Sequence, residues 1–118
     1  MPNLPQSQID GLLAAIQPER LLETAMALVA VPSPTRSAGA AAERLAEILR
    51  ADGFTVERPV ADWPQAPAVV VRYGTGRPGR VLQFDGHLDT VHLPFAPPIF
   101  ENGVLTGSGA SDMKGGIA

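Results

Sequence analysis

Three ionisable side chains occupy alternate positions at the end of an apolar run: Asp85, His87 and Asp89, within the heptapeptide FDGHLDT. Side chains alternate across an extended chain, so the three share one face, with neighbours about 6.5–7 Å apart along the backbone. A histidine that binds a metal ion usually gives its second ring N–H to a carboxylate, which fixes the tautomer. The spacing fits His87 as a metal ligand and Asp89 as its orienting partner. For the tripeptide alone, a solvated histidine followed by a turn-capping aspartate is the simpler interpretation.

A second candidate lies in the glycine-rich segment GSGASDMKGG, residues 107–116. Its four glycines let the backbone turn sharply and approach a ligand closely. The segment is not a Walker A phosphate loop, because Lys114 is followed by glycine instead of serine or threonine. It also lacks the dinucleotide-binding pattern, whose last glycine position is taken by Asp112, a charge that would repel phosphate. A carboxylate in such a loop suits a cation, although Asp112 as the N-cap of a helix beginning at Met113 explains it equally well.

Five other residues have side chains that could take part in chemistry, and each has a plainer explanation. His92 fits a solvated loop histidine better than a metal ligand. Asp85 is expected to face solvent or to lie outside the coordination shell, and Glu101 belongs to a hairpin. Lys114 is expected to be a solvated or loop-bracing cation. Trp63 is expected to anchor a loop.

The elements that must position these residues change from helical to extended near Gly53, which is placed as a left-handed helix cap. Pro18 suits the first position of a helix. We expect helices over 7–17, from 18 to the prolines at 32 and 34, and over 37–52. We expect strands over 54–58, 68–73 and 80–84, and a hairpin of 98–101 with 104–106 through a type I′ turn. Phe84 and Leu88 are expected to face the core.

Helices followed by strands favour an α/β or α+β arrangement, and we expect an α/β fold with helices packed on a mixed β-sheet. The 118 residues suffice for one domain, and a net charge of −3 without a basic face argues against nucleic acid as a partner. The absence of cysteine excludes disulfides and thiol nucleophiles. The N-terminal residues contain neither a basic leader nor a long apolar run, so we expect a cytoplasmic protein without a membrane partner.

The two segments LQFDGHLDTV and GSGASDMKGG, with 25 residues from His87 to Asp112, together resemble the paired signature of the dinuclear zinc exopeptidase and deacylase family. The resemblance implies a zinc-exopeptidase-like catalytic domain of which residues 1–118 form the N-terminal part. It further implies two divalent metal ions, zinc or alternatively cobalt. His87 would bind one ion, Asp89 would be the catalytic-site carboxylate that orients it, and Asp112 would bridge both. In this family the bond after the bridging aspartate, here Asp112–Met113, is often cis.

The resemblance implies metal-dependent hydrolysis of the amide bond of a small N-acyl amino acid or peptide, by a homo-oligomer. The general base and the other ligands would lie beyond Ala118, because DMKGGIA looks like the opening of a helix. We therefore expect a parent enzyme and an inactive segment. Ser108 stands where many members carry arginine, and the loop at 92–98 is short, which favours carboxypeptidase-like relatives over desuccinylases. The alternative is a non-catalytic structural or interaction module that retains the fold.

Overall fold

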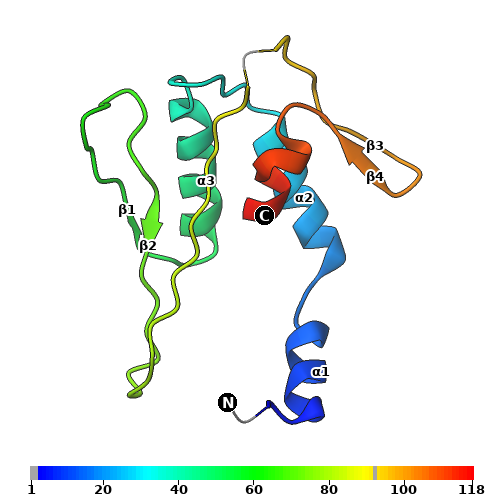
Figure 1. Ribbon diagram of the computed structural model, residues 1–118, viewed down its shortest axis with the longest axis vertical. Coiled ribbons are helices and arrows are strands. Elements are labelled where there is room, and N and C mark those ends of the chain that lie inside the picture. The colour runs from blue at the N-terminus through cyan, green and yellow to red at the C-terminus, as the bar shows by residue number, and fades with distance from the viewer. Residues whose placement is uncertain (1–2, 92) are drawn as a thin grey trace.

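The computed structural model describes residues 3–91 and 93–118. Three helices open the chain, two short β-pairs follow, and a wide kinked turn, η1, leads into a last short helix (Figure 1). The elements are α1 (Gln6–Ala14), α2 (Pro18–Val29), α3 (Gly39–Ala51), β1 (Val56–Glu57), β2 (Val70–Val71), β3 (Ile99–Glu101), β4 (Val104–Thr106), η1 (Ala110–Lys114) and α4 (Gly115–Ile117).

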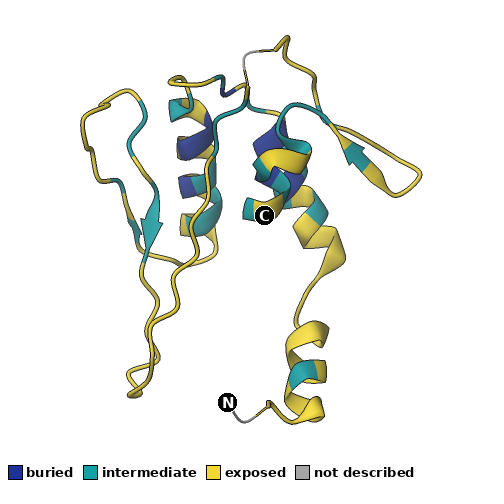
Figure 2. Ribbon diagram, viewed as in Figure 1, coloured by how far each residue is buried: buried dark blue, intermediate teal, exposed yellow. Residues whose placement is uncertain are grey.

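The core lies where α2 and α3 face each other (Figure 2). Pro18 begins α2, as predicted, because its fixed φ and missing N–H cost nothing at the first helical position. Leu28 and Val29 are fully buried at the end of this helix. Alanines supply the facing side of α3, where Ala41 and Ala46 are fully buried and their small side chains let the helices approach closely. The core is small and concentrated at the C-terminal end of α2.

α1 contributes no buried residue and extends away from the other helices (Figure 1). Its apolar side chains Leu12 and Leu13 are more than half exposed. None of the helices formed by residues 3–91 and 93–118 has both the length and the apolar character needed to cross a bilayer.

The expected hairpin is confirmed. β3 pairs antiparallel with β4, so that Glu101 lies opposite Val104. Asn102 and Gly103 connect the strands with φ values of 51° and 78°. Two consecutive residues with positive φ are what a type I′ turn requires, and asparagine followed by glycine adopts them most readily.

The single mixed sheet is not formed by the described residues, which form two separate antiparallel pairs, β1 with β2 and β3 with β4. The predicted strand at 80–84 is wrong: the segment is extended but pairs with no neighbour in the described part of the chain. Phe84 is 88% exposed instead of core-facing, whereas Leu88 is half-buried. The residues at 80–84 favour an extended backbone. A strand also needs a second chain segment that hydrogen-bonds to its N–H and C=O groups.

Candidate metal centre

The structure brings His87 and Asp112 into contact. The Nε2 atom of the imidazole lies 3.0 Å from Oδ1 of Asp112, although 25 residues separate them. The Nδ1 atom lies 3.1 Å from the carbonyl oxygen of Asp89 and 3.3 Å from its carboxylate Oδ1. One ring nitrogen therefore faces the predicted orienting residue, and the other faces the predicted bridging residue.

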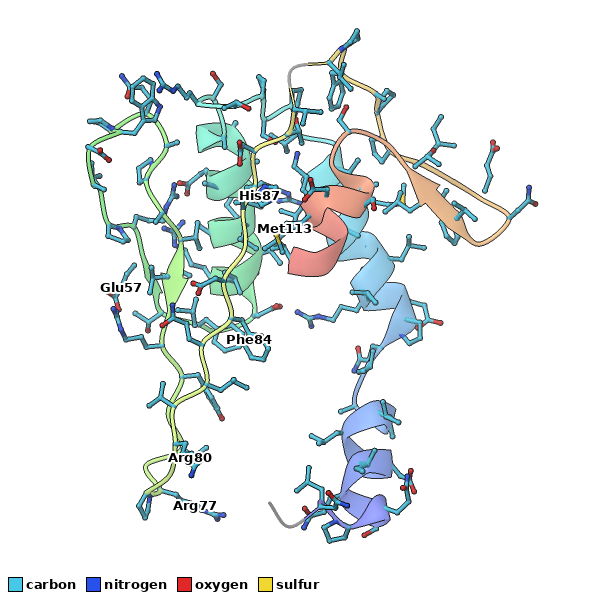
Figure 3. All side chains as sticks on the ribbon, in the orientation of Figure 1. Glu57, Arg77, Arg80, Phe84, His87 and Met113 are labelled. Carbon is cyan, nitrogen blue, oxygen red and sulfur yellow. The ribbon has the colours of Figure 1, made fainter. Side chains whose placement is uncertain are left out.

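The histidine lies on the extended segment that runs upward past α3 in Figure 3, and Asp112 lies in η1, next to Met113. Gly86 lets these two segments touch, because a Cβ there would collide with the side chain of Ile117 and come within 3.0 Å of Met113 Cε. A larger residue at position 86 would require the side-chain ends of Ile117 and Met113 to shift.

At two positions, the backbone of the glycine-rich turn has a positive φ, a conformation that favours glycine. Gly107 and Gly109 have φ values of 142° and 80°. Asp112 does not cap a helix, because Lys114 occupies the position before α4 and the Asp112 carboxylate faces His87 instead. The Asp112–Met113 bond is cis, at the position that the family resemblance implied.

The electrostatics of the site favour the protonated form of His87. A neutral imidazole carries only one N–H, yet both ring nitrogens of His87 face oxygen acceptors. Without a metal ion, the hydrogen bond to the Asp89 carbonyl raises the pKa of His87. The Asp112 carboxylate adds to this rise, and partial desolvation opposes it. The side chains of His87 and Asp112 are 48% and 80% exposed, so an ion can reach them from solvent.

The geometry of the pair fits two ligands of one metal ion. Zinc binds nitrogen and oxygen at about 2.0–2.1 Å in tetrahedral sites, which places two ligand atoms about 3.3 Å apart. The observed separation is 3.0 Å. Asp89 on the Nδ1 side fixes the tautomer that leaves the Nε2 lone pair free for metal. Within residues 3–91 and 93–118, no group of three or more His, Cys, Asp or Glu side chains could hold a metal ion.

The other predicted candidates lie outside this pair. Asp85 is exposed and accepts hydrogen bonds from Gln83 Nε2 at 2.9 and 3.1 Å. Glu101 is exposed on β3. His92 lies outside the described residues.

Trp63 anchors a loop, as predicted. Its indole N–H donates to the carbonyl oxygen of Arg36 at 2.9 Å, and the Arg36 guanidinium lies 5.2 Å from the ring centroid. Arg36 has a φ of 67°, unusual for a residue with a side chain, and this double contact stabilises it there.

Lys114 is not solvated: its side chain is fully buried, and Nζ donates to the carbonyl oxygen of Val31 at 2.7 Å. The bracing role is confirmed, but its partner, the carbonyl oxygen of Val31, was not predicted.

Ser33 was not identified from the sequence. It is 1% exposed, and its hydroxyl donates to the carbonyl oxygen of Leu88 at 2.7 Å. The sequence offered no signal for Ser33. For Lys114 it offered only an indirect one, because Lys114 is the one lysine of the chain.

Three curated relatives show what the chain resembles. It is 44% identical over 107 residues to the succinyl-diaminopimelate desuccinylase of Methylorubrum extorquens strain PA1, an alignment that covers 82% of this chain and 28% of the relative. It is 45% identical over 109 residues to the protein of that name from Methylorubrum populi, covering 82% and 27%. A third, from Methylobacterium radiotolerans, is 38% identical over 112 residues, covering 86% and 28%.

No protein-family model matches the chain, and no solved structure gives a significant match. The chain spans about 28% of the length of the curated relatives it matches. Their desuccinylase name does not support the preference for carboxypeptidase-like relatives, so Ser108 and the short loop at 92–98 do not set the chain apart from that branch. Over 82–86% of its length the chain is similar to succinyl-diaminopimelate desuccinylases, which are members of the zinc exopeptidase and deacylase family.

Proposed function

We propose that residues 1–118 supply the first metal-binding part of a metal-dependent hydrolase, which cleaves the amide bond of a small N-acyl amino acid. The observation that carries the proposal is the 3.0 Å approach of His87 Nε2 to Asp112 Oδ1. The pair joins the two segments in which the sequence predicted the metal ligands. The names of the relatives favour a succinylated amino acid as the substrate.

In this proposal each of the three residues has a separate role. His87 binds one divalent ion through Nε2, and Asp89 holds the Nδ1 proton and so the orientation of the ring. Asp112, whose Oδ1 lies 3.0 Å from Nε2 of His87, would be the carboxylate shared between the two ions. Two zinc ions, or cobalt in their place, would supply an activated water molecule and stabilise the oxyanion of amide hydrolysis.

The remaining ligands and the general base are assigned to residues outside these 118. A zinc site typically has three or four protein ligands, and His87 and Asp112 supply two. The greater length of the relatives supports this assignment. In the same proposal, residues 1–118 are the N-terminal part of the catalytic domain.

The alternative of a non-catalytic module is less well supported, because the relatives are named as desuccinylases. The proposal includes a cytoplasmic homo-oligomer that binds neither nucleic acid nor membrane. The homo-oligomer rests on the family resemblance, the cytoplasmic location and the lack of a membrane partner on the residue pattern of the chain, and the lack of a nucleic-acid partner on a net charge of −3 without a basic face.

A chimera tests the proposal. The part of the Methylorubrum extorquens desuccinylase that aligns with this chain is replaced by the chain itself, and release of succinate from succinyl-diaminopimelate is measured with added Zn²⁺. We expect an active chimera whose activity is lost in His87→Ala and Asp112→Ala and retained in Asp85→Asn. Activity that survives His87→Ala would contradict the proposal, as would turnover by the isolated 118-residue chain.

A further inference from the structure

Two polar side chains are fully buried in the described part of the chain, and both connect a metal-binding segment to the same short turn. They are Ser33 and Lys114, with exposed fractions of 1% and 0%. The turn is Val31–Ser33, which follows the C-terminal end of α2. Buried hydrogen-bonding groups of this kind cost free energy unless each finds a partner, so their partners identify what they hold.

Ser33 holds the segment of His87. Its hydroxyl donates to the carbonyl oxygen of Leu88, the residue between His87 and Asp89, across 55 positions of sequence. Its own carbonyl oxygen accepts from the backbone N–H of Thr90 at 2.8 Å. Ser33 therefore hydrogen-bonds to the histidine segment on both sides of Asp89. These bonds fix the position of that segment relative to the Val31–Ser33 turn.

Lys114 holds the segment of Asp112. It lies two residues after the aspartate, and its Nζ reaches Val31 across 83 positions of sequence. Its side chain passes Gly109, where a Cβ would lie 3.3 Å from Lys114 Cδ. The acceptor Val31 lies two residues beyond the last residue of α2, so this hydrogen bond connects η1 to the turn that follows the helix.

We propose that the turn Val31–Ser33 is the template that sets the separation of His87 and Asp112. Ser33 is the positioning residue for His87, and Lys114 is the positioning residue for Asp112. Neither touches the ion. The two segments that supply the metal ligands meet because each is tied to neighbouring residues of one turn at the end of the buried core. The consequence for metal affinity rests on the proposed function, whereas the consequence for the His87–Asp112 contact does not.

The template can be tested in the 118-residue chain with Co²⁺ alone as the probe. Outer partners of metal ligands typically change metal affinity about 10–100-fold when removed. We expect at least a tenfold loss of Co²⁺ affinity in Ser33→Ala and in Lys114→Met, measured by calorimetry and visible absorption. Ser33→Thr retains the hydroxyl and is expected to retain the affinity. Ser108→Ala is the matched control, because Ser108 Oγ accepts from Ala96 N–H at 2.8 Å in the same glycine-rich segment without reaching the turn.

A metal-free measurement separates the template from the proposed function. In the unmodified chain, nuclear magnetic resonance is expected to show a protected Nε2 proton on His87, bonded to Asp112. In Ser33→Ala and Lys114→Met this signal is expected to vanish while circular dichroism retains the helical content. A general loss of stability would lower the unfolding midpoint without removing the signal. If the unmodified chain alone binds no Co²⁺, the proposed function is still decided by the chimera, and the proton signal still tests the template.

The template is overturned if both substitutions leave the Nε2 proton and the Co²⁺ affinity as they are in Ser108→Ala. The two hydrogen bonds are independent, so either variant decides if the other does not fold. If neither folds, the unmodified chain decides. Lys114 is its only lysine, so the Nζ resonance is unambiguous. Saturating Zn²⁺ is expected to shift it, and a resonance that does not move overturns the template.

Discussion

Gly109 and the methyl group of Thr90 touch where the two metal-binding segments cross: a Cβ on Gly109 would lie 2.7 Å from Thr90 Cγ2. Gly109 also has a φ of 80°. This van der Waals contact packs the segment of His87 against the segment of Asp112. It adds to the hydrogen bonds that both segments make with the Val31–Ser33 turn.

Replacing Gly109 by alanine should destabilise the chain for two reasons, positive φ and the collision with Thr90. Positive φ alone costs a residue with a side chain about 1–3 kcal/mol. We expect a larger loss in the free energy of unfolding than in Gly76→Ala, where φ is 72° and nothing lies within 4 Å. Urea unfolding measures both, and Thr90→Ser should recover part of the difference. Equal losses in the two variants would show that the crossing is not tight.

The metal-free chain should have a His87 pKa above the ordinary value of 6.5, because the Asp89 carbonyl and then the Asp112 carboxylate favour the imidazolium. Asp112→Asn should lower this pKa without returning it to the ordinary value, since the backbone carbonyl of Asp89 remains. The ring C–H resonances, followed against pH, measure it. An unchanged pKa in Asp112→Asn would contradict the observed contact.

The same shift predicts how stability depends on pH. A group whose pKa is raised in the folded state stabilises it fully below the unfolded pKa, near 6.5, and this contribution is lost as pH rises through the folded pKa. The free energy of unfolding should fall over that window in the metal-free chain, and the fall should be smaller in Asp112→Asn. His87→Gln is the control, because it removes the titrating group.

Metal binding by the chain should depend on His87 and Asp89 and not on Asp85. His87→Ala is expected to abolish Zn²⁺ binding, and Asp89→Asn to weaken it about 10–100-fold, because the carboxylate 3.3 Å from Nδ1 loses its charge. Asp85→Asn is the matched control, because Asp85 contacts Gln83 and is exposed. Calorimetry with a competing chelator measures the affinities, and excess chelator should restore the metal-free spectrum. Equal weakening by Asp85→Asn and Asp89→Asn would refute the assignment.

Lys114 should resist acylation in the native chain. As the only lysine, it offers one reactive side-chain amine besides the N-terminus, and its side chain is fully buried. Mass spectrometry should find one acyl group added to the native chain and two after unfolding in urea. Rapid native acylation at Lys114 would show that its bond to Val31 is not maintained.

The extended segment at 80–84 should drive self-association. Val81 is 96% and Phe84 88% exposed, and the unpaired backbone between them can pair with another chain. Val81→Lys with Phe84→Lys is expected to shift the chain toward monomer in sedimentation experiments. Leu12→Lys on α1, which is also exposed, should have less effect because its helix has no unpaired edge.

Local features were predictable from the sequence because neighbouring residues decide them. Pro18 fixes the start of α2, and Asn102-Gly103 fixes the hairpin turn, each through the φ values that these residues favour. The pattern of His87, Asp89 and Asp112 was informative through the family resemblance, since each of the two segments taken alone had a plainer explanation. The segments that form the candidate site could therefore be named before their geometry was known.

Tertiary structure alone decided which of these segments are paired, buried or in contact. The run at 80–84 has the composition of a strand, but pairing needs a neighbour that its own residues cannot supply. Ser33 and Lys114 are ordinary polar residues whose burial follows from partners 55 and 83 positions away. Contacts over such distances depend on how α2 and its following turn pack, and no local periodicity records that. The sequence thus determined which groups could bind a cation, whereas the packing around the end of α2 determined that two of them meet.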